Sequence, residues 1–200
     1  MKRSMILAAL AAALLSACAA PGQMRSEVTR FHQLPASGGP VAIVAADAGK
    51  SGDPAFGDYA RIVGARLSAA GFPPVAGGAP DFIAQLDYSQ QPVAADDDDG
   101  GPRIGIGFGS ESYGRHGAVG VGFGTSFPIG GRDRDQIAMR TVTLVIERRA
   151  DGSRVFEGRA RSMGPAANFT RAIPLMIDAI FDNFPGESGR TVTVDAAVTP

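Results

Sequence analysis

Three segments alternate apolar and polar residues with a period of two, which predicts half-buried strands over 81–88, 137–149 and 154–161. Their clearest apolar positions are Phe82, Ala84, Leu86 and Tyr88 in the first segment, and Val142, Leu144 and Ile146 in the second. The residues Asp-Gly-Ser at 151–153 are a turn signal between the second and third segments. We therefore expect 137–149 and 154–161 to pair as a tight hairpin.

Two segments repeat apolar residues at the spacing of helical turns. The first spans 53–71, where Asp53 can cap the first amides, Pro54 suits the first helical position and Gly71 can end the helix. The second spans 168–184, and its regular part is expected to begin near Pro174 or to kink there. The apolar stripes are Phe56, Tyr59, Ala60, Val63, Leu67 and Ala70, and then Phe169, Ile173, Met176, Ile177, Ile180, Phe181 and Phe184.

Weaker patterns predict further strands over 27–34, 40–47 and 190–195. The segment 40–47 is apolar on both faces, so we expect a central strand that is covered on both sides. Together these elements predict a single α+β domain over 27–196. Its mixed or antiparallel sheet has about five to six strands, a typical sheet size, and the two amphipathic helices pack on one face.

Glycine is concentrated in one insertion, 96–134, which begins with an acidic run of four aspartates. The pieces 104–109 and 119–124 each alternate an apolar side chain with glycine, and the simplest interpretation is a long β-hairpin. Its glycine face would admit another backbone or ring closely. An insertion without regular structure is the alternative, because glycine weakens strands. The candidate contact surface of the hairpin consists of Ile104, Ile106, Phe108, Tyr113, Val119, Val121 and Phe123.

The N-terminal residues have the order of a secretory signal: Lys2 and Arg3, an apolar run over 5–15, and then small residues before Cys18. A spanning helix needs about 20 apolar residues, so this run is too short for one. Ordinary cleavage without lipid remains an alternative. Cys18 is the only cysteine, and it therefore has no intrachain disulfide partner.

The sequence Leu-Ser-Ala-Cys at 15–18 resembles the lipobox of bacterial lipoproteins. The resemblance implies that 1–17 is a signal peptide, that Cys18 becomes the first residue and carries acyl chains such as palmitate, and that 18–26 is a lipidated tether. Ala19, where Asp would retain the protein in the inner membrane, implies passage to the periplasmic face of the outer membrane. Membrane lipid is then a partner of the chain through Cys18.

Charge and composition exclude several functions. Nineteen Lys and Arg against 20 Asp and Glu leave no basic excess of the kind that nucleic-acid binding requires. The two histidines lack nearby Cys, His or carboxylate residues at the spacing of a zinc site, so no metal is expected. The segment Asp-Ala-Gly-Lys-Ser at 47–51 lacks the earlier glycine of a phosphate-binding loop, because position 44 is Val. We expect no cofactor and no catalytic residue.

The order of these elements resembles the bacterial lipoprotein family known as domain of unknown function 4136, over roughly 27–189. The matching motifs are Gly71-Phe72, Asp81 at the start of its strand, Phe156-Glu157-Gly158 and Phe184-Pro185. Members often have Trp where Phe156 stands. The resemblance implies an α+β periplasmic domain and supplies no catalytic residue.

Three functions are consistent with the sequence. The first is a non-catalytic envelope lipoprotein that binds an envelope protein or a small ligand, with strand addition at the glycine-rich hairpin as one mode. The second is an oligomeric or membrane-inserting role for the hairpin, although its six patterned residues fall short of the roughly 9–11 that span a bilayer. The third is an enzyme acting on envelope material, which would need converging carboxylates.

Overall fold

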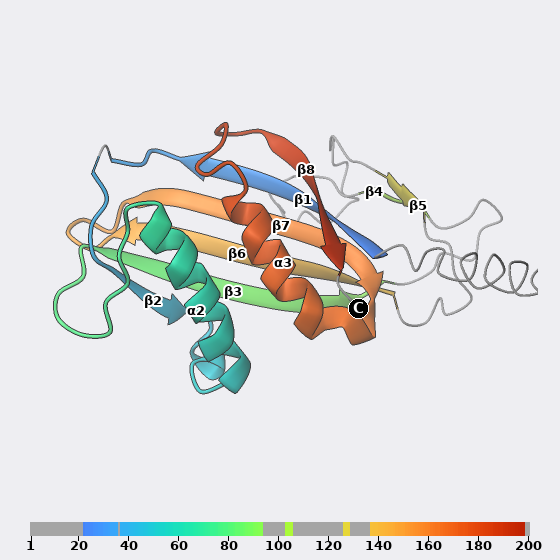
Figure 1. The fold of residues 1–200 in the computed structure, drawn as a ribbon, viewed down its shortest axis with the longest axis horizontal. Coiled ribbons are helices and arrows are strands. Elements are labelled where there is room, and N and C mark those ends of the chain that lie inside the picture. The colour runs from blue at the N-terminus through green and yellow to red at the C-terminus, as the bar shows by residue number, and fades with distance from the viewer. Residues whose placement is uncertain (1–21, 36, 94–102, 106–125, 129–136, 199–200) are drawn as a thin grey trace, which may run out of the picture.

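Six strands with alternating apolar side chains form one mixed sheet (Figure 1). The computed structural model describes residues 22–35, 37–93, 103–105, 126–128 and 137–198. The strand order is β2-β3-β6-β7-β1-β8, in which β2 pairs parallel to β3 and the other neighbours pair antiparallel. The bounds are Gly22–His32 (β1), Val41–Ala45 (β2), Phe82–Pro92 (β3), Ile137–Arg148 (β6), Arg154–Pro165 (β7) and Thr191–Val198 (β8). A separate antiparallel pair joins Arg103–Gly105 (β4) and Ser126–Pro128 (β5).

Two helices lie on one face of the sheet, and the core lies between them and the strands (Figure 1). α2 spans Pro54–Ala69 and α3 spans Phe169–Phe181; the short 3-10 helices Ala48–Lys50 (η1) and Ala166–Asn168 (η3) precede them. Buried residues of the strands include Val28, Leu86, Val142, Leu144, Ile146 and Phe156, and those of the helices include Val63, Leu67, Ile173, Met176, Ile177 and Ile180. The predicted α+β sheet with two helices is confirmed.

The predicted ends of α2 are also confirmed. The Asp53 side chain accepts a hydrogen bond from the Ala55 amide at 2.9 Å, and Gly71 has a φ of +88° just after the helix. In α3, by contrast, the helix begins at Phe169, and Pro174 lies inside it instead of starting it. A proline there removes one helical hydrogen bond, and the burial of the neighbouring Ile173 against the sheet offsets that loss.

Two expectations about the sheet are wrong. β1 begins at Gly22, so residues 22–26 belong to the sheet and not to the tether predicted over 18–26. Their register with β8 explains this, because Met24 and Ser26 are buried on the core side. β2 is an edge strand and not a central one, and Val44 is 39% exposed. Its apolar run faces the helix layer on one side only.

The two ends of the sheet differ in what they connect. At one end Gly22 pairs with Val198, Pro92 with Ala138, and Ile137 with Pro165. Residues 93–136 link β3 to β6 there, so we call this the insertion end. The opposite end carries the β6–β7 turn, and we call it the turn end. Figure 1 shows β1 starting at the insertion end, on the same side as β4 and β5.

A buried arginine on β1 joins the end of α3 to the sheet. Arg30 is 4% exposed, and its Nε donates to the carbonyl of Ile180 at 2.8 Å. Its Nη2 donates to the carbonyls of Ala179 at 2.7 Å and Asp182 at 2.8 Å. The last carbonyls of a helix lack helical partners, and the negative end of the helix favours a cation. Burial lowers the pKa of Arg30, but arginine starts so high that the guanidinium stays charged.

Replacing Arg30 with Met should lower the free energy of unfolding by about 3 kcal/mol, because buried carbonyls lose charged donors. Urea denaturation of the purified domain measures this loss. The matched control is Arg25→Met on the same strand, where the exposed pair with Asp195 spans 3.0 Å. That exposed pair should contribute less than about 1 kcal/mol. Equal losses for the two variants would contradict the role of Arg30.

Candidate functional site

A cluster of polar side chains surrounds Tyr88 at the start of α2. The Tyr88 hydroxyl lies 3.1 Å from Asp53 Oδ2, so the residue that caps α2 also accepts a bond from β3. The ring of Tyr88 packs edge-on against Tyr59, with centroids 5.0 Å apart. Lys50 Nζ lies 4.8 Å from the centre of the Tyr88 ring and 2.6 Å from Asp87 Oδ1. These contacts tie η1, α2 and β3 together.

The chemistry of this cluster is structural and does not activate a nucleophile. Burial, followed by the hydrogen bond to Asp53, raises the pKa of Tyr88 to about 12. The phenol therefore stays protonated near neutral pH and acts as a hydrogen-bond donor. Lys50 also donates to the Tyr88 carbonyl at 2.6 Å, so its ammonium is engaged within the fold.

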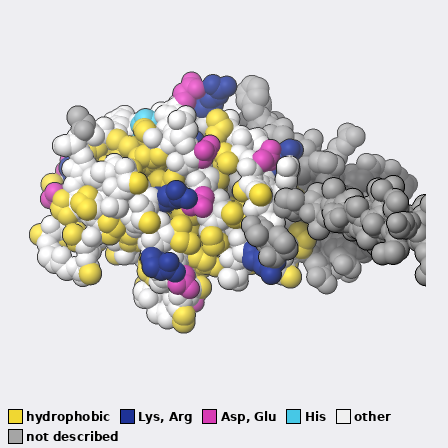
Figure 2. All heavy atoms as spheres, viewed as in Figure 1, with side chains coloured by type: hydrophobic (Ala, Val, Ile, Leu, Met, Phe, Trp, Pro, Cys, Tyr) yellow, Lys and Arg dark blue, Asp and Glu magenta, His cyan; other side chains and the backbone are white. Residues whose placement is uncertain are grey.

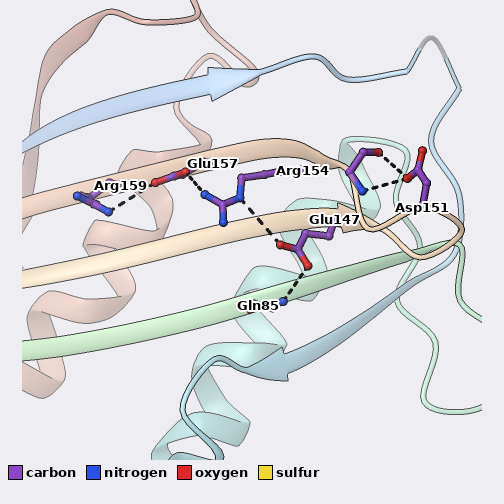
Figure 3. Close-up of polar contacts among 7 residues, drawn as sticks. Gln85, Glu147, Asp151, Arg154, Glu157 and Arg159 are labelled. Atoms are coloured by element: carbon purple, nitrogen blue, oxygen red, sulfur yellow. Dashed lines mark hydrogen bonds and ion pairs between the residues drawn. The ribbon is translucent and has the colours of Figure 1, made fainter. Parts of the chain in front are cut away.

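The sheet face opposite the helices carries a ladder of polar side chains that crosses three strands (Figure 3). Gln85 Nε2 on β3 donates to Glu147 Oε2 on β6 at 3.1 Å. Arg154 on β7 lies 4.0 Å from Glu147 Oε1 and 2.7 Å from Glu157 Oε2. Glu157 Oε1 is then 3.5 Å from Arg159 Nη2.

This ladder supplies a flat, mixed-charge surface. Its two carboxylates each face a guanidinium, and such partly exposed pairs contribute only about 0–1 kcal/mol each. The arrangement therefore does little for stability. Since neither carboxylate is positioned against the other, it also lacks the paired acid and base of a hydrolase.

The turn beside the ladder is fixed by Asp151 (Figure 3). Its side chain accepts bonds from the Ser153 hydroxyl at 2.7 Å, the Ser153 amide at 3.0 Å and Arg148 Nη1 at 3.0 Å. The Ser153 hydroxyl is the main cause that lowers the pKa of Asp151 to about 2. Asp151 thus remains ionised as a turn residue across the physiological range.

A groove of three adjoining hollows follows the helix side of the molecule from the turn end. Their volumes are about 580, 480 and 380 Å³. The first, near Arg149, shares Pro35 and Gly38 with the second, which is lined by aromatic rings. The second shares Arg66 and Phe181 with the third, which lies between α3 and β8. Figure 2 shows hydrophobic side chains along this helix-bearing face, interrupted by charged ones.

Most of the predicted site residues lie outside the described residues. These are Cys18, Ile106, Phe108, Tyr113, Val119, Val121 and Phe123. Ile104 is described in its backbone and pairs with Phe127 through β4 and β5. That short antiparallel pair is all that the described residues contain of the predicted hairpin, and the hairpin as a whole stays a prediction.

Sequence reasoning missed the ladder and the role of Arg30. The signal for the ladder was present, because Glu157, Arg159 and Arg161 occupy every second position of a predicted strand. Arg30 lies two residues after the buried Val28 and therefore on the same face of β1. An arginine on the core face of a strand could have been recognised as a buried cation that needs carbonyl or carboxylate partners.

Two searches confined to the described ranges were negative. No group of three or more His, Cys, Asp or Glu side chains there is arranged to hold a metal ion. No helix in those ranges is long and apolar enough to cross a membrane.

Comparison with known protein families identifies one match. The family model described as "Domain of unknown function (DUF4136)" matches residues 44–186. This confirms the resemblance seen in the motifs Gly71-Phe72, Phe156-Glu157-Gly158 and Phe184-Pro185, all of which lie within the matched range. A search of curated proteins gave no match.

Several solved structures have a similar arrangement at low sequence identity. A variant PelC dodecamer from Paraburkholderia phytofirmans has 11% identity and a TM-score of 0.42, over 78% of this chain and 93% of that chain. The PelC dodecamer in another crystal form has 11% identity and a TM-score of 0.41, over 78% and 94%. A PDZ domain protein from Parabacteroides distasonis ATCC 8503 has 11% identity and a TM-score of 0.49, over 93% of this chain and 42% of that chain.

Raising the pH should destabilise the fold through Tyr88. Its folded pKa of about 12 lies above the usual value of 10.0, so its contribution is complete below pH 10 and is lost as the pH rises toward 12. We expect the urea midpoint to fall over this window, and to fall less in Tyr88→Phe. An identical pH dependence in the variant and the parent would contradict the assignment to Tyr88.

Proposed function

This chain belongs to the DUF4136 family, and we propose that it acts as a lipid-anchored, non-catalytic binding domain of the bacterial envelope. In this proposal Cys18 carries the acyl chains, and the domain stands on the periplasmic face of the outer membrane. Residues of the glycine-rich insertion contact an envelope partner. The observation that carries the proposal is the shared sheet end from which the N-terminal segment and the insertion both leave.

The start of β1 supports a close anchor. Only residues 19–21 separate Cys18 from Gly22, the first residue of the strand. Four peptide steps span at most about 14 Å. A lipid on Cys18 would therefore hold the insertion end of the sheet against the bilayer surface, more tightly than a tether over 18–26 would.

The register of the sheet supports a role for the insertion beside that anchor. The insertion runs from the end of β3 at Pro92 to the start of β6 at Ile137. Both residues lie at the same end of the sheet as Gly22. Both ends of the insertion therefore start at the sheet end that would carry the anchor, although β6 and β3 lie two and three strands away from β1 in the strand order. Its apolar positions, among them Phe108 and Phe123, are then available to a partner in the membrane or at its surface.

The polar groups support a binding role over catalysis. Tyr88 and Asp53 fasten α2 to β3, Glu147 and Glu157 pair with Arg154, and Asp151 fixes a turn. Each of these groups has a structural partner at close range.

Labelling cells with a palmitate analogue should mark the purified protein, because in this proposal the acyl chains are attached to Cys18. Cys18→Ala should lose the label and move from the membrane fraction to the soluble periplasmic fraction. Three acyl chains bind a membrane far more firmly than one, so the shift should be nearly complete. Ser16→Thr serves as a control for a general defect in export. An unlabelled parent protein, or a Cys18→Ala variant that stays with the membrane, would refute the anchor.

Deleting residues 101–131 should leave the sheet folded and remove contact with the envelope partner. The pairing of Pro92 with Ala138 lies outside the deletion, so the melting temperature should change by only a few degrees. In-cell crosslinking from positions 104–124 in the parent identifies the captured protein, and the deletion variant should no longer copurify with it. Continued copurification would move the contact surface to another part of the domain.

A further inference from the structure

We draw no further inference here: the strongest candidate, the aromatic-lined hollow of about 480 Å³ where Phe72 follows α2 and Phe181 ends α3, is an apolar surface for which nothing in the structure shows what covers it.

Discussion

The guanidinium of Arg30 is the interaction on which the arrangement of sheet, helix and final strand depends. From a buried position, this guanidinium donates hydrogen bonds to three backbone carbonyls at the end of α3. The Arg30 carbonyl also accepts a bond from the Gly189 amide at 2.7 Å, so the same residue holds the loop that leads into β8. Gly186 in that loop has a φ of +74°, and a Cβ there would lie 2.9 Å from Arg30 Nη1. Arg30 therefore holds the end of α3 through its guanidinium and the loop before β8 through its backbone carbonyl.

The two ends of the sheet differ in how their strands are connected. At the turn end the chain closes on itself, with the Arg149 amide bound to the Asp81 carbonyl and the Arg148 amide bound to the Ser153 carbonyl, both at 2.8 Å. At the insertion end β3 and β6 are joined by residues 93–136, of which the structure describes 93, 103–105 and 126–128. A surface insertion is tolerated best where the backbone on both sides of it is already hydrogen-bonded in the fold. The insertion end meets that condition, since Pro92 and Ile137 are both held in strands.

The sequence predicted those elements whose local signals agree with their surroundings. Asp53, Pro54 and Gly71 mark the ends of α2 because capping and a left-handed stop are local effects. The position of β2 at the edge was not predictable, because an apolar run does not reveal how many sheet neighbours a strand has. The early start of β1 was missed for a similar reason: residues 22–26 are polar and glycine-containing, and their pairing with β8 depends on residues far along the chain. The alternate charged residues of β7 were visible in the sequence, but which strands the ladder joins depends on strand order, which periodicity does not encode.

The small cost of closing a long loop explains how the sheet can carry an insertion so different from it in composition. Closing a loop costs conformational entropy that rises only with the logarithm of its length, about 0.6 kcal/mol for each doubling. β3 and β6 pair over eleven residues, from Phe82 opposite Arg148 to Pro92 opposite Ala138, and this pairing outweighs such a cost. The core residues Leu86 and Leu144 are fixed regardless of what links the two strands. The composition of residues 93–136 therefore does not have to meet the packing demands of the core between the helices and the sheet.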